Sequence, residues 1–270
     1  MRQIFSVLAL LALGACAGNP PVRQPPLRTA SENAHRSALA ATQAQRWDDA
    51  ARSWREALIG YQAIDDWNGQ GLARLGLAHV LDWQGRKDLA GATLTDMPEQ
   101  SLFPASLRAQ ASFRLAQLRL PDKPELSRQL LDRAIVLCGN RCSLQAQFDN
   151  FAARLAAARG DWSIVIRHAD AALSSVQDNP AERAHARRLL TEAALAQGRA
   201  VDARQLIGLV LNDDRQLADP HWLALDYALQ AKVAEALNDD SLLLEAETRH
   251  GILCEAARLT DCPSLMRQKP

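Results

Sequence analysis

The segment at residues 45–58, QRWDDAARSWREAL, shows the pattern on which the whole chain is built. A turn signal is followed about five residues later by a small residue, then by a large apolar residue and another small one. The same order returns in QGRKDLAGATL (84–94), RGDWSIVIRHADAAL (159–173) and QGRAVDARQLIGLVL (197–211). Stretches with helical spacing of apolar residues, such as GLARLGLAHVLDW (71–83), precede the later turns. A helix pair with one alanine-rich face cannot bury that face alone, so the pairs are expected to stack.

The turn signals recur at an almost constant interval. They fall 37 to 41 residues apart, near Gln45, Gly85, Asp122, Gly160, Gly198 and Asp239. Runs of β-branched residues are few, and no segment alternates as a half-buried strand does. The sequence therefore predicts an all-α, right-handed superhelical solenoid of about six helix pairs over residues 29–262, followed by a short tail at 263–270.

This pattern resembles the tetratricopeptide repeat, in its longer variety of about forty residues. Small residues stand where helices of that family cross closely: Ala38, Ala78, Ala153 and Ala193 in the first helices, and Ala50, Ala90 and Ala203 in the second, with Val165 at the corresponding position of the fourth repeat. The third repeat (LPDKPEL, 120–126) and the sixth (LNDDSLLL, 237–244) depart from the pattern and rest on spacing. The resemblance implies a concave surface that binds peptides or protein segments.

The repeat register predicts which side chains face that concave surface. The candidates for partner binding mix polar, apolar and charged groups of both signs: His35, Leu39, Gln43, Leu75, His79, Asp82, Asn150, Arg154, His185, Arg188 and Glu192. The alternative for each is an ordinary solvent-facing helix position.

The tryptophans are expected to divide into two kinds. Four of them, Trp47, Trp54, Trp83 and Trp162, are predicted to pack between helices. Trp67 stands beside Asn68-Gly69 and is the one expected to be exposed.

The first residues have the layout of an export signal. Arg2 precedes a ten-residue apolar run, residues 4–13, which is too short to cross a bilayer. Leu13-Gly14-Ala15-Cys16 resembles the lipobox of bacterial lipoproteins, which implies that residues 1–15 are a signal peptide and that Cys16 carries the lipid. In that family a residue other than Asp after the cysteine, here Ala17, implies the outer membrane and its periplasmic face. Alternatively, Ala15-Cys16-Ala17 serves as an ordinary cleavage site that releases a soluble periplasmic protein.

A proline-rich segment follows this signal. Residues 16–28 contain Pro20-Pro21 and Pro25-Pro26, which favour extended polyproline II. They are predicted to form a linker between the anchor and the solenoid.

Four further cysteines form two close pairs along the chain. In an oxidising compartment these pairs predict disulfides Cys138–Cys142 and Cys254–Cys262, the first around a Gly139-Asn140 turn. Cross-pairing, free thiols and a four-thiolate zinc site are the alternatives. Neither spacing is the CxxC of zinc knuckles or redox motifs, so we expect no metal.

Charge and motifs narrow the functional classes. The 31 basic and 31 acidic residues balance, which argues against a nucleic-acid surface. No metalloprotease helix, nucleophile elbow or phosphate-binding loop is present, so we expect no catalytic residue and no cofactor besides the covalent lipid.

These observations predict a lipid-anchored scaffold or adaptor that binds protein partners in a cell-envelope assembly. The architecture is similar to that of the pilotins of type IV pili and of the repeat-bearing subunit of the β-barrel assembly machinery. The alternatives are a regulator of a peptidoglycan enzyme and a peptide-binding protein in soluble periplasmic form.

Cys16→Ala should abolish labelling of the chain by a lipid precursor, because the thiol is the proposed attachment point. Metabolic labelling with fatty acid, followed by membrane fractionation, measures this. Cys138→Ala is the matched control and should keep the label. Unchanged membrane retention of the Cys16→Ala chain would contradict the anchor.

Overall fold

The computed structural model describes residues 25–120, 122–140, 142–176, 178–259 and 262. The predicted signal peptide at 1–15, the predicted lipid attachment site Cys16 and the predicted tail at 263–270 lie outside the described residues. Within them the chain forms helices and no strand: α1 (Pro26–Gln43), α2 (Trp47–Ala63), α3 (Trp67–Trp83), α4 (Lys87–Leu94), α5 (Ala105–Arg119), α6 (Pro124–Cys138), α7 (Gln145–Ala157), α8 (Trp162–Ser175), α9 (Pro180–Ala196), α10 (Ala200–Leu217), α11 (Pro220–Leu237) and α12 (Asp240–Ala256). No helix among them is both long enough and apolar enough to span a membrane.

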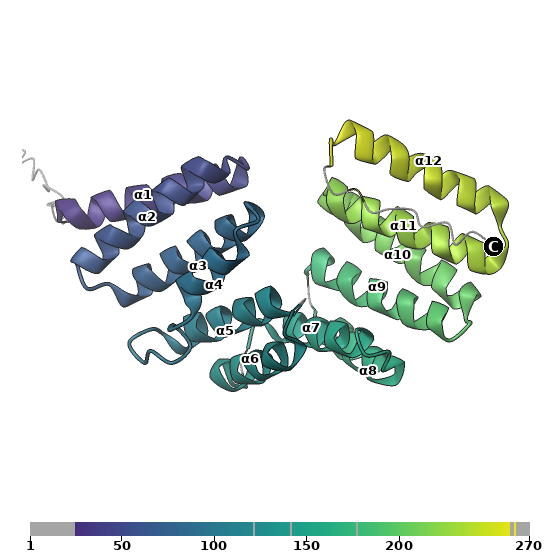
Figure 1. Ribbon diagram of the computed structural model, residues 1–270, viewed down its shortest axis with the longest axis horizontal. Helices are drawn as coiled ribbons and strands as arrows, with labels where there is room; N and C mark the ends of the chain where they lie inside the picture. The colour runs from purple at the N-terminus through teal and green to yellow at the C-terminus, as the bar shows by residue number, and fades with distance from the viewer. Residues whose placement is uncertain (1–24, 121, 141, 177, 260–261, 263–270) are drawn as a thin grey trace, which may run out of the picture.

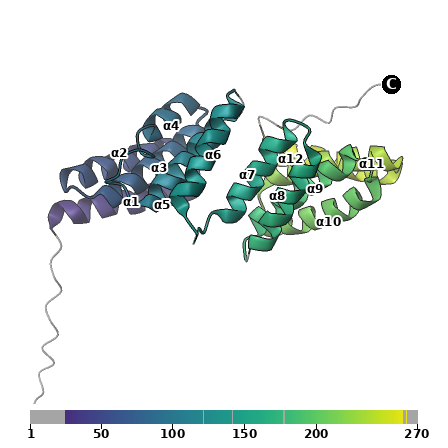
Figure 2. The same cartoon turned by 90° about the horizontal axis from the view of Figure 1, so that it is seen from below.

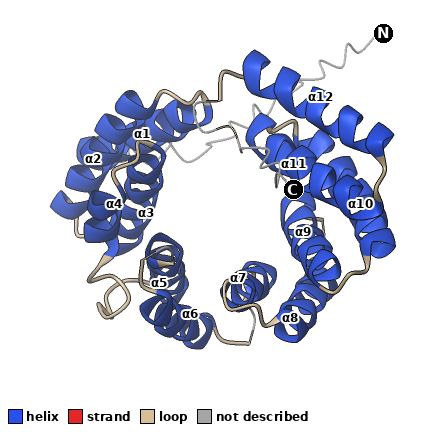
Figure 3. Ribbon diagram, turned by 45° about the vertical axis from the view of Figure 1, so that its right-hand side comes forward, coloured by secondary structure: helices blue, strands red, loops and turns tan. Residues whose placement is uncertain are grey.

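The helices stack in pairs along a curved path (Figure 1). The odd-numbered helices lie on the inner side of the curve and the even-numbered helices on the outer side (Figure 3). The all-α superhelical solenoid of six helix pairs predicted from the repeats is therefore confirmed.

Small residues at the crossings let neighbouring helices approach closely. The predicted contact alanines Ala38, Ala78, Ala153 and Ala193 are completely buried, as are Ala50, Ala90, Val165 and Ala203. In the third repeat a serine takes this place. The Ser127 hydroxyl donates to the backbone oxygen of Ala116 at 2.7 Å, so its polar atom is satisfied inside the core.

The turns inside the pairs share one backbone conformation. Gln45, Gly85, Gly160, Gly198 and Asn238 all have positive φ angles, from 53° to 75°. In each turn the amide of the next residue bonds back to a carbonyl five residues earlier, as from Arg86 to Leu81 at 2.8 Å. This is the Schellman end of a helix, for which glycine is favoured because it has no Cβ.

The start of the solenoid differs from the predicted boundary. Helix α1 begins at Pro26, so residues 26–28, predicted as linker, are helical. Proline suits the first turn of a helix, where its missing N–H has no partner to lose. Arg28 also reaches the carboxylate of Asp66 at 3.4 Å, which holds this first turn against the start of α3.

Three phenylalanine rings join the two halves of the stack. Figure 2 shows α1–α6 and α7–α12 as two groups. Between them the ring of Phe113 on α5 meets those of Phe148 and Phe151 on α7 edge-on, at 5.0 and 5.5 Å between centroids. The core is therefore continuous through the middle of the molecule.

The cysteines lie at disulfide distance in the predicted pairs. Cys138 and Cys142, 5.3 Å apart at Cα, connect the end of α6 to the segment before α7 and pack on the phenylalanine cluster. Cys254 and Cys262, 5.8 Å apart at Cα, connect the end of α12 to the segment beyond it.

Two tryptophan predictions are wrong. Trp67 is partly buried, because its ring lies edge-on to Phe103 at 5.0 Å. Trp83 is 56% exposed, because it is the last residue of α3. Its ring stacks on Trp47 at 5.4 Å and meets His79 edge-on at 6.3 Å. Trp54 is buried, and Trp47 and Trp162 pack at the edge of the core.

Two Gly→Ala substitutions should change stability in opposite directions. Gly85 has a φ of +73°, so Gly85→Ala should lower the free energy of unfolding by about 1 kcal/mol. Gly208 lies exposed inside α10 with open space around it, so Gly208→Ala should raise that energy by about 0.5–1 kcal/mol. Urea unfolding followed by circular dichroism measures both. Equal effects would contradict the role of the turn.

Candidate functional site: a groove on the inner side

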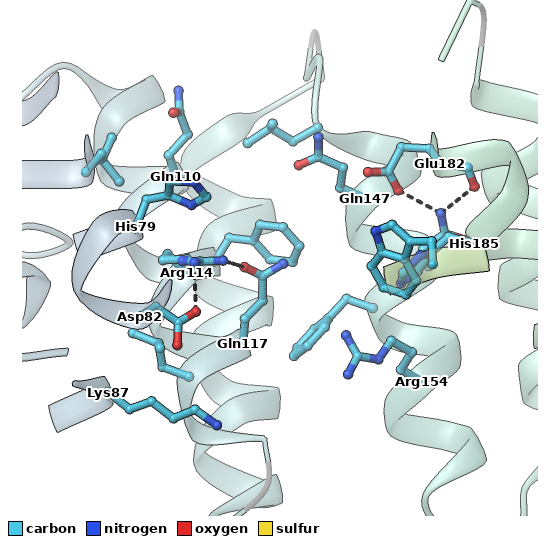
Figure 4. Close-up of a pocket in the computed structure, with 17 residues that line it drawn as sticks. His79, Asp82, Lys87, Gln110, Arg114, Gln117, Gln147, Arg154, Glu182 and His185 are labelled. Carbon is cyan, nitrogen blue, oxygen red and sulfur yellow. Dashed lines mark hydrogen bonds and ion pairs between the residues drawn. The ribbon is translucent and has the colours of Figure 1, made fainter. Parts of the chain in front are cut away.

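A groove of about 720 Å³ opens on the inner side of the curve, across the middle of the stack. Helices α3, α5, α7, α9 and α11 supply most of its walls, and Lys87 begins α4. Its lining residues are Leu75, His79, Asp82, Lys87, Gln110, Phe113, Arg114, Gln117, Leu118, Leu144, Gln147, Asn150, Phe151, Arg154, Glu182, His185 and Trp222. Figure 4 shows the side chains of α3 and α5 facing those of α7 and α9 across it.

One wall is held by an ion pair between α3 and α5. The Arg114 guanidinium donates to the Asp82 carboxylate at 2.8 Å and to the Gln117 side-chain oxygen at 3.1 Å (Figure 4). Both charges in this pair are compensated. The ion pair itself therefore adds no net charge to this wall.

The opposite wall is held by Asn150 on α7. Its amide nitrogen donates to the backbone oxygen of Glu182 at 2.9 Å and to the Glu182 carboxylate at 2.8 Å. Burial raises the pKa of Glu182, and the hydrogen bond from Asn150 opposes that change. Asn150 is thus a structural clamp between α7 and α9, and it is itself buried.

Two cations in the groove, Arg154 and Lys87, form no ion pair with a described residue. Within the described part of the chain, the Arg154 guanidinium forms neither a hydrogen bond nor an ion pair, and it lies 5.9 Å from the centre of the Phe151 ring. Its surroundings lower its pKa, mainly through burial, while Glu192 raises it. Lys87 likewise forms no ion pair with a described residue. Both side chains bring positive charge to the groove, and that of Arg154 lies beside an aromatic ring.

The two groove histidines are neutral at neutral pH. Burial lowers the pKa of His185 to about 3, with further lowering by Arg188 and Arg154. Burial also lowers the pKa of His79, assisted by Arg114 and opposed by Asp82. Neither histidine adds positive charge to the groove.

A buried ion cluster supports the wall from behind. Arg188 on α9 donates to Asp226 on α11 at 2.7 Å and to Asp214 on α10 at 2.5 Å. Its guanidinium also lies 4.7 Å from the centre of the Trp222 ring. The cluster therefore ties three helices together and positions the ring that closes the groove.

The structure brings together six of the eleven predicted partner-binding residues. The six that line the groove are Leu75, His79, Asp82, Asn150, Arg154 and His185. His35 lies elsewhere, bonded to the Tyr61 hydroxyl at 3.1 Å and packed on Trp54, while Leu39 and Gln43 are exposed near the first end of the stack.

The remaining two residues of that prediction lie behind the groove. Arg188 is 9% exposed, because Asp214 and Asp226 draw it into the core. Glu192 is partly buried and acts on Arg154 only through its charge.

The prediction missed the contribution of α5. The third repeat lacks the turn glycine, so no concave positions were assigned to it. The spacing of Gln110, Phe113, Arg114 and Gln117 places all four on one helical face, and this signal could have identified them.

Among the described residues, one group of three potential metal ligands lies close together, and it is outside the groove: His250, Cys254 and Cys262. The four-thiolate alternative does not fit, because the two cysteine pairs lie at the α6–α7 connection and at the end of α12. The groove itself is equipped for binding through charge, rings and hydrogen bonds.

No protein-family model matches the sequence, and no curated protein matches it. Among solved structures, PilW, described as a widely conserved type IV pilus biogenesis factor, is similar with a TM-score of 0.62 at 18% identity, over 86% of this chain and 95% of PilW. BtubC from P. vanneervenii is similar with a TM-score of 0.59 at 16% identity, over 92% of this chain and 98% of BtubC. The likeness is one of fold. This chain is a helical solenoid of the tetratricopeptide type.

Asp214→Asn should remove a pH dependence of stability. Burial and the neighbouring Asp226 carboxylate raise the pKa of Asp214 to about 7, against an ordinary 3.8. The folded state therefore binds more protons than the unfolded state between these values, and the stability contributed by Asp214 is lost as pH rises towards about 7. As pH rises over this range, the free energy of unfolding of the Asp214→Asn variant should therefore increase relative to that of the wild type, by at most about 1.4 kcal/mol per pH unit.

Urea unfolding from about pH 4 to about pH 8 measures this difference. Asp202→Asn, in the same helix but half-exposed, is the control and should follow the wild type. A parallel pH profile for Asp214→Asn and the wild type would contradict the assignment.

Proposed function

We propose that this chain is a scaffold that binds an extended segment of a protein partner in the groove on its inner side. The observation that carries the proposal is Arg154, a guanidinium that forms no ion pair with a described residue and lies beside the Phe151 ring, in a groove with further apolar surface from Phe113 and Trp222. A carboxylate on the partner would pair with this cation, and an adjacent apolar side chain would cover the rings.

The groove is more suitable for a peptide than for a small molecule. It is open along one side, and its lining comes from five successive inner helices. Solenoids use such extended concave surfaces for binding, since the repeats present side chains at regular intervals. An extended segment can contact several of these helices at once.

We further propose that the scaffold works at the cell envelope, anchored through a lipid on Cys16 at the periplasmic face of the outer membrane. The lipobox-like residues 13–16 support the anchor. The fold likeness to PilW, a type IV pilus biogenesis factor, is consistent with a role in an envelope assembly.

Site-specific crosslinking in cells tests the groove. A photo-crosslinking residue at Gln147, in the groove, should capture a defined partner. The same residue at Val136, 80% exposed on α6, should not. Arg154→Gln should reduce capture from Gln147 roughly tenfold, the expected effect of losing one charge-assisted hydrogen bond of about 1.4 kcal/mol.

Arg167→Gln is the matched control, because Arg167 is an exposed arginine on the outer helix α8. Capture that is equal from Gln147 and Val136, or insensitive to Arg154→Gln, would overturn the groove as the binding site. A captured peptidoglycan enzyme whose activity changes on binding would replace the scaffold by a regulator.

A further inference from the structure

The C-terminal end of the solenoid gathers three side chains that can bind a metal. His250 and Cys254 are four residues apart on α12, so they lie one above the other on the same face of the helix. Beyond the helix the chain turns through Arg258, with a φ of 51°, and Cys262 lies beside the other two. The imidazole Nε2 is 3.5 Å from the Cys262 sulfur and 3.8 Å from the Cys254 sulfur.

These separations are close to those between ligands of a tetrahedral zinc ion. With Zn–S near 2.3 Å and Zn–N near 2.0–2.1 Å, a nitrogen and a sulfur ligand lie about 3.5–3.6 Å apart. The imidazole is already at this distance from both sulfurs. His250 is also only 5% exposed, so its ring has a defined place against the cysteines.

The other cysteine pair, Cys138 and Cys142, has no such neighbouring histidine among the groups of potential ligands in the described residues. Cys138 and Cys142 lie at the same kind of helix end, but no such group of three ligands surrounds them within the described residues. The pair next to His250 therefore has a chemical capacity that the pair next to the phenylalanine cluster lacks.

We propose that reduction of the Cys254–Cys262 disulfide opens a Cys₂His site for a thiophilic divalent cation such as Zn²⁺. A dithiol reductant supplies two electrons and two protons and becomes a disulfide, while the protein disulfide becomes two thiols. On metal binding each thiol releases its proton, and the neutral imidazole donates the lone pair of Nε2. The sulfurs separate to about 3.8 Å, and water takes the fourth position.

With such a site, the C-terminal end of the solenoid can be crosslinked in two ways. The disulfide and the metal each connect the segment beyond α12 to the last turn of that helix. Either crosslink therefore holds the same segment against the same helix.

Cobalt binding to the full chain tests the proposal. The chain is reduced with a dithiol, separated from it under nitrogen and titrated with Co²⁺. One Co²⁺ per chain should bind, with thiolate-to-cobalt charge-transfer absorbance and tetrahedral d–d bands, and Zn²⁺ should displace it. The oxidised chain should show neither band.

Three variants assign the ligands. Cys254→Ser should lose the charge-transfer band of the site, and His250→Asn should weaken binding at least about tenfold and change the d–d bands. The matched control, Cys138→Ser/Cys142→Ser, should bind as the wild type does. Cys16 is present in all these chains, so any contribution from its thiol is the same.

Absence of tetrahedral bands in the reduced wild type would overturn the site, and so would equal binding by His250→Asn. If the His250 variant loses its helical circular dichroism, Cys262→Ser replaces it, since this residue lies beyond α12. Unchanged binding in Cys262→Ser would equally overturn the proposal.

Discussion

At most crossings between neighbouring helices the chain places alanine or another small side chain, and the rest of the structure depends on this close approach. The contact alanines from Ala38 to Ala203 are completely buried. Gly76 of α3 lies directly against the Trp54 ring of α2, where an added Cβ would come within 2.3 Å of ring atoms. Larger residues would push the helices apart, because a close-packed interior accommodates extra volume only by moving backbone. The close approach of neighbouring helices sets the curvature of the stack, and the inner groove lies on the concave side of that curve.

The charged side chains in and behind that groove are of two kinds: some form ion pairs that hold helices together, and others form no such pair. Asp82 and Arg114 compensate each other across α3 and α5, and Arg188 is compensated by the buried Asp214 and Asp226. Removing one member of a buried ion pair leaves the other without compensation, so these pairs specify which helices meet more than they add stability. Arg154 and Lys87 take part in neither pair. Their charge is not taken up by an ion pair among the described residues, so the proposed binding groove combines walls held by paired charges with two cations that can attract a ligand.

The two cysteine pairs hold different parts of the solenoid. Cys138 and Cys142 lie where the first half of the stack passes into the second, next to the Phe113 ring cluster, and so restrain the connection between α6 and α7. Cys254 and Cys262 close the last helix, beside His250. A short disulfide loop removes little entropy from the unfolded chain, so its main effect is to fix local geometry. Both crosslinks connect the end of a helix to the segment that follows it.

What the sequence alone determined about this protein is local: the helix pairs, their period and the turns at Gln45, Gly85, Gly160 and Gly198. Each of these features depends on residues a few positions apart. The spacing of glycines and of small residues along the sequence therefore predicts them directly. The tertiary structure alone decided which side chains face the groove. Arg188 is buried by Asp226, 38 positions further on, and Asn150 is held by Glu182, 32 positions away. The two wrong tryptophan predictions have the same origin. The Phe103 ring covers part of Trp67, and Trp83 is exposed because it lies at the end of α3. Contacts of this separation arise from how the helices stack, which no single repeat encodes.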